Sequence, residues 1–141
     1  MIIYLACTVR GDRGAVAALR ALVSRLEGEG HRVLTKHLLD DDVETSEAQL
    51  SEQAVYSRDI GWLEACNLLI ADASGSSYGV GFEVGYVLGR ADGSDQRVIL
   101  LYRADRKDRI SRLISGNAHP RCWVVPYDGI EDLVSSVLAR L

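Results

Sequence analysis

The chain has no long hydrophobic run, no excess of basic residues and no clustered cysteines. Its first apolar run, residues 2–7, is far shorter than the roughly 20 residues that cross a bilayer and follows no basic residue, so we expect neither a signal peptide nor a membrane partner. Lys and Arg number 16 against 20 Asp and Glu, and this net charge of −4 argues against a nucleic-acid partner. The three cysteines, at positions 7, 66 and 122, form no C-x-x-C pair. That spacing excludes a disulfide framework and a metal site, and it indicates a reducing, cytoplasmic location.

Short apolar runs alternate with amphipathic segments along the whole chain. Hydrophobic residues make up 48% of the 141 positions, enough for one domain, residues 1–141, to bury roughly 70% of its unfolded surface. We expect strands at 2–7, 32–39, 67–72, 97–102 and 122–127, and helices at 15–29, 46–66, from the 74–85 stretch to about 90, within 103–117, and at 130–141. The strands are apolar on both faces. The predicted fold class is therefore α/β: a single-domain, doubly wound, Rossmann- or flavodoxin-like sheet of five parallel strands with helices on both faces.

Ligands bind such sheets outside the carboxyl ends of the strands, and residues 74–85 follow one of these ends. The stretch offers hydroxyls, glycines and a helix start, which together suit a phosphate group. Glu83 lies in that helix, whose field is expected to keep its carboxylate ionised, as a nucleophile requires; an ordinary acidic residue matched to a helix dipole is the alternative. Gly81, Gly85 and Gly89 recur every four residues, which indicates close packing by a helix or subunit, or the approach of a ligand.

Asp59 interrupts an apolar helical stripe. Val55 precedes it by four residues, and Trp62 and Leu63 follow it by three and four. An isolated buried carboxylate is costly, so Asp59 either caps a neighbouring loop or lines a cleft. In a cleft its apolar surroundings would raise its pKa, so that it could hold a proton or accept a sugar hydroxyl.

The loop from Thr8 to Gly14 carries a hydroxyl, two guanidiniums and glycines. These groups suit a phosphate or a base, but they are also typical of a solvated turn. His37 is either a binding residue or a satisfied histidine at a strand end. Ser57 and Arg58, and the arginines between 103 and 112, are interpreted as exposed charge.

Four patches of the sequence together resemble the nucleoside 2-deoxyribosyltransferase superfamily, and more closely its branch of 2′-deoxynucleoside 5′-phosphate N-hydrolases. They are Ile3 to Gly11, Val33 to His37, Arg58 to Leu63 and Ser77 to Gly85. The D-x-x-W-L and S-x-G-V-G-F-E-x-G patterns are specific in combination, and the likeness covers nearly the whole chain. Cys7-Thr8 stands where the family typically has Gly-Ser, which narrows the space beside a ligand, and Asp12 adds a negative charge to the loop.

The resemblance implies roles for individual residues. Glu83 matches the nucleophile, Asp59 its carboxylate partner and Tyr4 a tyrosine of the sugar pocket, so these three are the expected catalytic residues. Ser111 matches a serine that reaches the phosphate held by the adjacent subunit of a homodimer. The expected substrate-binding residues are Thr8, Val9, Arg10, Gly11, Arg13, His37, Ser77, Gly79, Gly81 and Ser111.

The implied activity is hydrolysis of the N-glycosidic bond of (2′-deoxy)nucleoside 5′-monophosphates, through a glycosyl ester on Glu83, with no metal or organic cofactor. Three alternatives stay open from the sequence. They are a transferase that exchanges bases, a hydrolase of ribonucleotides such as a pyrimidine monophosphate, and a non-catalytic nucleotide-binding or receiver-like module. A receiver would use Asp72 as phospho-acceptor, but Cys7-Thr8 offers no acidic pair.

Overall fold

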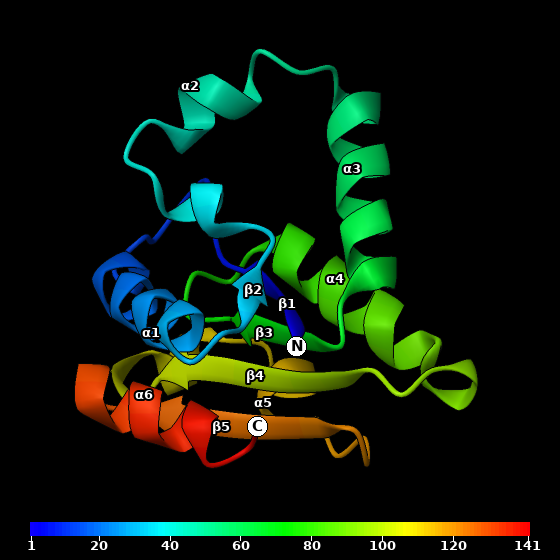
Figure 1. The fold of residues 1–141 in the computed structure, drawn as a ribbon. Helices are drawn as coiled ribbons and strands as arrows, with labels where there is room; N and C mark the ends of the chain where they lie inside the picture. Colours follow the sequence, from blue (N-terminus) through cyan, green and yellow to red (C-terminus); the bar gives the residue numbers. More distant parts are fainter.

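The structure is a computed structural model that describes residues 1–141, apart from the side chain of Ala91. Five parallel strands form one sheet in the order β2-β1-β3-β4-β5 (Figure 1). The strands are β1 (Ile2–Ala6), β2 (Arg32–Val33), β3 (Leu68–Asp72), β4 (Arg97–Arg103) and β5 (Cys122–Tyr127). The predicted doubly wound α/β fold is confirmed.

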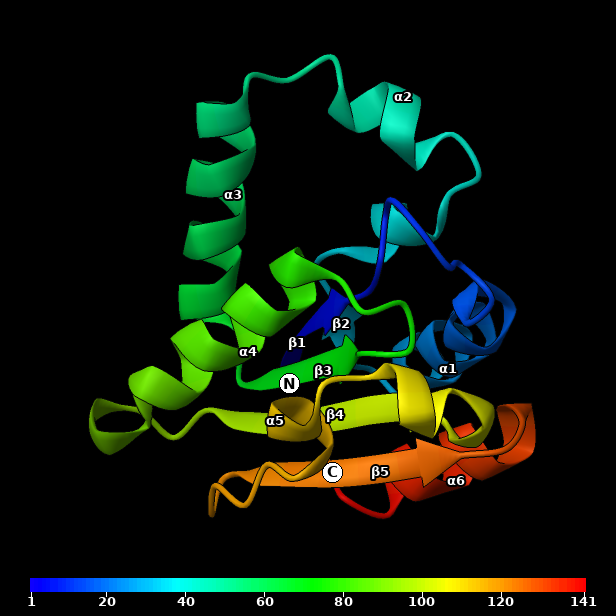
Figure 2. The same cartoon turned by 180° about the vertical axis from the view of Figure 1, so that it is seen from behind.

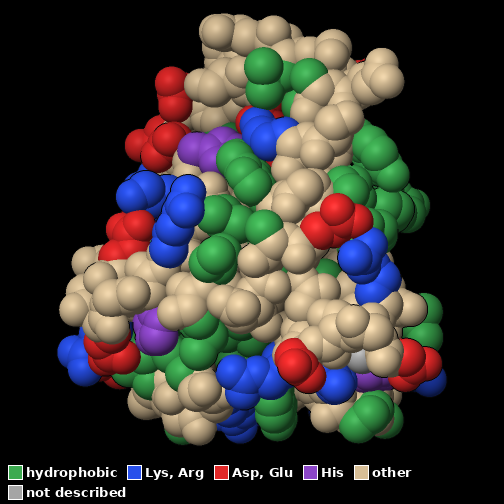
Figure 3. Space-filling view, turned by 45° about the vertical axis from the view of Figure 1, so that its right-hand side comes forward, with side chains coloured by type: hydrophobic (Ala, Val, Ile, Leu, Met, Phe, Trp, Pro, Cys, Tyr) green, Lys and Arg blue, Asp and Glu red, His purple; other side chains and the backbone are tan. Residues whose placement is uncertain are grey.

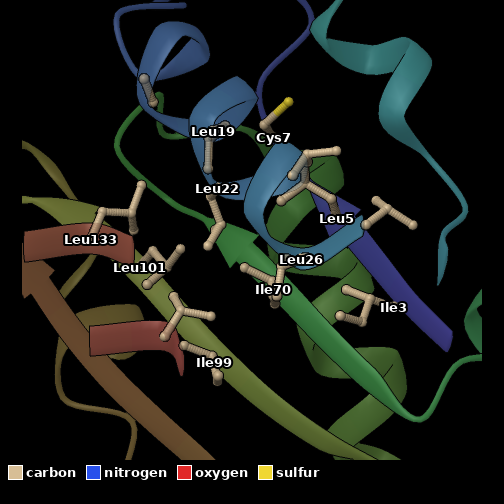
Figure 4. Close-up of a cluster of buried hydrophobic side chains, with 14 of the residues drawn as sticks. Ile3, Leu5, Cys7, Leu19, Leu22, Leu26, Ile70, Ile99, Leu101 and Leu133 are labelled. Carbon is tan, nitrogen blue, oxygen red and sulfur yellow. The ribbon is translucent and has the colours of Figure 1, made fainter. Parts of the chain in front are cut away.

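Helices α1 (Val16–Gly28) and α6 (Ile130–Leu138) cover one face of the sheet. The apolar face of α1, with Leu19, Leu22 and Leu26, packs on Leu5 and Ile70 (Figure 4). These side chains are fully buried. This face is therefore a closed hydrophobic core.

Helices α3 (Glu52–Ala65), α4 (Tyr78–Gly89) and the short α5 (Arg112–Ser115) lie on the other face (Figure 2). Three short 3₁₀ helices complete the chain: η1 (Lys36–Leu39), η2 (Ala91–Gly93) and η3 (Ala104–Arg109). None of the described helices is long and apolar enough to cross a membrane. Lys and Arg side chains are interspersed with Asp and Glu on the face that Figure 3 presents, so no charge of one sign dominates it.

The connections after β1 and β3 run to opposite faces, because β1 leads into α1 and β3 leads into α4. These two strands are neighbours in the sheet. At the carboxyl ends of β1 and β3 the chain therefore leaves the sheet toward opposite faces, and doubly wound sheets bind their ligands at such a point.

The second strand is much shorter than predicted. The sequence indicated a strand from 32 to 39, but β2 ends at Val33 and residues 36–39 form η1. The Thr35 hydroxyl accepts a hydrogen bond from Leu5 N (2.8 Å) and donates one to Leu5 O (2.6 Å). A side chain thus satisfies the backbone groups of β1 that a longer β2 would have paired, and the chain is free to turn.

The helix predicted from 46 to 66 is two helices, α2 (Val43–Glu47) and α3. The break comes where Ser51 adopts an extended conformation and its hydroxyl accepts a hydrogen bond from Ala54 N, which caps α3. The segment from α2 to α3 arches above the carboxyl ends of the strands (Figures 1 and 2). Glu47 on α2 and Asp59 on α3 are thereby brought to the same side of the molecule.

Candidate active site

A cavity of about 290 Å³ lies at the point where β1 and β3 end, beneath α2 and α3. It is lined by Cys7, Val9, Arg10, Leu38, Glu47, Val55, Asp59, Ser77, Gly79, Val80 and Glu83. Six of the predicted site residues therefore share one cavity, and they come from the β1–α1 loop, α3 and the start of α4. Two of them, Asp59 and Glu83, are carboxylates from different helices.

Glu83 is hydrogen-bonded to the sheet beneath it. The hydroxyl of Tyr4 donates to Glu83 Oε1 at 2.6 Å, and Tyr4 is fully buried on β1. A short bond from a buried hydroxyl holds one oxygen of the carboxylate and leaves the other available to a ligand. The structure thus joins two of the three residues expected to be catalytic.

Burial raises the pKa of Glu83 to about 7, and the nearby charge of Asp59 adds to the rise, while the hydrogen bond from Tyr4 lowers the pKa. The sequence had indicated a carboxylate held ionised by the helix N-terminus. The side chain instead lies in the second turn of α4, where desolvation is the larger effect. Near neutral pH the cavity therefore contains Glu83 in both protonation states.

Asp59 is held by its sequence neighbour. Arg58 Nε donates to Asp59 Oδ1 at 2.9 Å, and the two terminal nitrogens of Arg58 bind both oxygens of Glu47, at 2.8 and 2.9 Å. The interpretation of Arg58 as exposed charge is wrong, since its side chain is only 21% exposed. The guanidinium also stacks over Trp62, 4.9 Å from the ring centre.

His37 lies at the edge of this cluster, outside the residues that line the cavity. Its Nε2 is 3.3 Å from Glu47 Oε1, but without the alignment of a hydrogen bond, and its ring meets Trp62 edge-on at 5.7 Å. His37 is therefore placed to contact the wall of the site through Glu47.

The β1–α1 loop combines one buried hydroxyl with a structural arginine. Thr8 is 4% exposed and its Oγ1 has no hydrogen-bond partner within the chain. Arg13 donates to the carbonyls of Thr8, Leu38 and Asp40 and braces the loop against η1. The guanidinium of Arg13 thus binds main-chain carbonyl groups and holds the loop in place.

Glycine is required at two positions, one within this loop and one in the β3–α4 loop that packs against it. Gly11 has φ +122°, a conformation that other residues rarely adopt. A Cβ on Gly75 would collide with the side chain of Thr8, so the β3–α4 loop can lie this close to the β1–α1 loop only because residue 75 is a glycine. Asp12 pairs with Arg103 at 3.0 Å and with Arg106 at 3.3 Å, so its charge is compensated on the side of η3.

Only one of the three serines between β3 and α4 lines the cavity. Ser74 Oγ accepts from Arg103 N at 2.8 Å, and Ser76 Oγ donates to Arg109 O at 2.9 Å, so both hydroxyls fasten the loop after β4. Ser77 caps α4 and lines the cavity with Gly79. The first backbone N–H groups of α4 have no partner within the helix, so this end of the cavity suits an anion.

Gly81 and Ser111 lie outside the cavity. They line a separate, largely apolar groove of about 410 Å³ between the start of α4 and α5, to which Ser77 also belongs. Ser111 caps α5 through a bond from Leu113 N. Ser77 and Val80 line both the cavity and the groove, which therefore adjoin.

The glycine face of α4 is open within this chain. A Cβ built on Gly81, Gly85 or Gly89 would meet no atom within 4 Å outside the helix's own backbone. Among the described residues no helix packs closely there, so of the explanations that the glycine spacing offered, a second subunit or a ligand remains.

Asp72 is unsuited to the receiver-like alternative. It is 2% exposed and accepts hydrogen bonds from Tyr127 Oη (2.8 Å) and Ser74 N (3.0 Å). Burial raises its pKa. The side chain is thus a buried link between β3 and β5.

The sequence offered little sign of three residues that shape the cavity. Glu47 lies on a helix too short to show a periodic pattern. Arg58 directly precedes Asp59, and that adjacency was the one available signal. The thiol of Cys7 joins the α1 core to the cavity wall, and burial raises its pKa to about 12.

Known proteins resemble the chain over most of its length. The model of the nucleoside 2-deoxyribosyltransferase family matches residues 3–120. A protein of Thermofilum pendens, provisionally named 2′-deoxynucleoside 5′-phosphate N-hydrolase 1, is 36% identical over 141 residues, which cover 100% of this chain and 95% of that protein. The mouse 5-hydroxymethyl-dUMP N-hydrolase is 32% identical over 140 residues, 98% of this chain and 78% of its own.

The shared architecture extends to a solved structure. The CMP N-glycosidase of Clostridium botulinum superimposes with a TM-score of 0.73 and 19% identity, over 100% of both chains, which shows a common fold. The family itself is shown by the match of the family model and by the identity with the Thermofilum pendens protein, and it is the family that the sequence patterns indicated: the chain belongs to the nucleoside 2-deoxyribosyltransferase family.

Proposed function

We propose that the protein hydrolyses the N-glycosidic bond of (2′-deoxy)nucleoside 5′-monophosphates. The observation that carries the proposal is the pair of carboxylates, Glu83 and Asp59, in one cavity, with Glu83 hydrogen-bonded to the buried Tyr4. Two carboxylates facing one sugar are the machinery of glycoside cleavage. The names of the relatives, N-hydrolases of 2′-deoxynucleoside 5′-phosphates, support the same chemistry.

The proposed reaction has two displacements. The ionised Glu83 attacks C1′ while the bond from C1′ to the base nitrogen breaks, and the base leaves as an anion that takes a proton from solvent. Water then attacks C1′ of the glutamyl ester, Asp59 takes the proton of this water and returns it to solvent, and Glu83 is released as a carboxylate. The products are a free base and (2-deoxy)ribose 5-phosphate, and no cofactor takes part.

The 5′-phosphate is proposed to bind between the β1–α1 loop and the start of α4. The Thr8 hydroxyl is buried and unpartnered, so a ligand acceptor would satisfy it. Ser77 and Gly79 line the cavity beside this loop, and Arg10, paired with Glu44 at 3.3 Å, is the cation at its mouth. Val9 and Gly11 are proposed to shape the loop around the substrate. A cytoplasmic location, which the sequence predicts, is part of this proposal.

The active unit is proposed to be a homodimer formed through α4 and α5. Tyr78, Phe82 and Leu113 are 99%, 53% and 84% exposed, and the glycine face of α4 is open beside them. Ser111 lines the apolar groove, not the cavity of its own chain. If Ser111 contacts a phosphate, as its family counterpart implies, that phosphate belongs to the second copy. This requirement favours a dimer over a monomer.

A panel of deoxyribonucleoside and ribonucleoside monophosphates tests the activity directly. Incubation with each nucleotide, followed by chromatography, should release free base and the sugar phosphate in equal amounts. Addition of a second base distinguishes the transferase, which would form an exchanged nucleoside. A folded protein that releases base from none of the nucleotides contradicts the proposal, and ligand-induced thermal stabilisation without turnover would indicate a binding module.

The dimer has its own test. Phe82→Glu with Leu113→Glu should yield a monomer in sedimentation and lower the rate of base release, while Ile130→Glu, an exposed apolar residue on α6, should change neither. A wild-type protein that sediments as an active monomer contradicts the shared site.

A further inference from the structure

Three side chains form a chain of contacts along the wall of the cavity. Glu47 on α2 binds Arg58 through both oxygens, and Arg58 binds Oδ1 of Asp59. Their side chains are 18%, 21% and 26% exposed, so solvent screens the two pairs less than it does surface pairs. The contact with Arg58 lowers the pKa of Glu47, which is therefore ionised.

The contact between Arg58 and Asp59 is not a local feature of the helix. Side chains at adjacent positions of an α-helix point about 100° apart and do not face each other. Arg58 reaches Asp59 only because its guanidinium is turned toward Glu47, which binds two of its nitrogens, and Trp62 supports its plane. The anchor thus comes from a different helix.

This anchoring fixes the orientation of Asp59. A guanidinium held by a bidentate pair and an aromatic ring has little rotational freedom. Its Nε–H then holds Oδ1 and restrains the carboxylate of Asp59, which lines the same cavity as Glu83. Three carboxylates face this one small cavity: Glu47, Asp59 and Glu83. The single positive charge of Arg58 also offsets part of their negative charge.

We propose that Arg58 is a positioning residue for Asp59, and that Glu47 is the residue that anchors Arg58. The inference rests on the proposed function. It adds that α2, a short helix outside the sheet layers, is part of the catalytic apparatus.

Kinetics of Arg58→Gln, Glu47→Gln and Asp59→Asn test this role. Arg58→Gln should lower kcat about 30-fold, with KM changed by less than about 3-fold, because orientation of a general base affects the chemical step more than binding. Arg58→Lys keeps the positive charge but not the planar group that binds both oxygens of Glu47, and it should recover part of the rate. Glu47→Gln keeps one hydrogen bond to Arg58 and should lower kcat about 5-fold.

A double-mutant cycle separates positioning from a merely structural role. If Arg58 acts through Asp59, Arg58→Gln should change kcat by less than about 2-fold in a chain that already carries Asp59→Asn. Arg25→Gln, which breaks the surface pair of Arg25 with Glu29 on α1, is the control and should leave kcat unchanged.

Equal losses from Arg58→Gln in both backgrounds overturn the inference, as does a loss that follows the melting temperature alone. If Arg58→Gln does not fold, Glu47→Gln in the two backgrounds decides in the same way. A wild-type protein that releases base, together with an unaltered kcat in both variants, removes this inference and leaves the proposed function intact. A folded wild type without turnover removes both.

Discussion

The two faces of the sheet are built from the same strands but differ in what fills them. On the α1 and α6 face, β1 and β3 present Ile3, Leu5 and Ile70, which pack into a closed core. On the α3 and α4 face, the corresponding positions near the carboxyl ends are Ala6, Ala71 and Ala73.

The difference in side-chain size has a consequence for function. Large residues on one face are buried in the closed core, and small ones on the other leave room for the short hydrogen bond from Tyr4 to Glu83 on α4. We therefore expect substitutions on the α1 and α6 face to lower the stability, and substitutions on the α3 and α4 face to lower the rate of base release.

The largest expected effect is on the α4 face. Glu83→Gln keeps the shape of the side chain but removes the nucleophile, so the rate of base release should fall by about 1,000-fold or more, equivalent to roughly 4 kcal/mol of barrier. Steady-state assays on the folded variant measure it. An unchanged rate would exclude a nucleophilic role for Glu83.

The same variant should alter the pH dependence of stability. The pKa of Glu83 is raised from 4.5 to about 7 in the folded protein, so the folded state binds more protons than the unfolded state between these values. Wild-type stability should therefore decrease as pH rises from 4.5 to 7, and Glu83→Gln should lack this component. Urea unfolding at several pH values compares the two.

On the opposite face the effect should fall on stability alone. Leu22→Ala removes a fully buried side chain of α1 and should lower the free energy of unfolding by about 2–5 kcal/mol. The rate of base release per folded molecule should stay within about 2-fold of wild type, because Leu22 is not among the residues that line the cavity. A large loss of kcat in the folded variant would show that the two faces are coupled.

Tyr4→Phe tests the one bond that links the sheet to the nucleophile. Because the Tyr4 hydroxyl lowers the pKa of Glu83, its removal should shift the rise in rate, expected near pH 7 in the wild type, to higher pH. At neutral pH the rate should fall about 10-fold, and part of this loss should be regained at pH 8 to 9. A pH profile identical to that of the wild type would show that the bond does not control Glu83.

The smallest effect is expected at Gly85→Ala. A Cβ there meets open space, so within one chain the substitution should stabilise α4 by up to about 1 kcal/mol. If α4 packs on a second copy, the same methyl group should weaken that contact and raise the dimer dissociation constant. Thermal unfolding and sedimentation of the variant measure the two effects, and an unaltered dimer would place the interface elsewhere.

The sequence was most informative where a pattern repeats. Apolar strands and the stripe of α1 predicted the sheet and its layers, and the pattern around Ser77 and Glu83 predicted the family. It was least informative where one side chain replaces a regular element, as Thr35 does at the end of β2.

The sequence also does not predict contacts between segments that are distant from each other along the chain. Glu47 and Arg58 are 11 residues apart on two helices, and nothing in their spacing predicts a bidentate pair. The raised pKa of Glu83 likewise depends on burial by β1 and on the charge of Asp59, which only the folded chain brings together.

The most direct test of the central role of Glu83 is to trap the proposed ester. A nucleoside monophosphate with fluorine at C2′ slows both displacements, because fluorine destabilises the positive charge that develops at C1′. Mass spectrometry of the digested protein should then show one equivalent of base released and the fluorinated sugar phosphate attached to the peptide that carries Glu83. A protein that turns over the ordinary substrate but carries the sugar on another residue, or on none, would contradict the account.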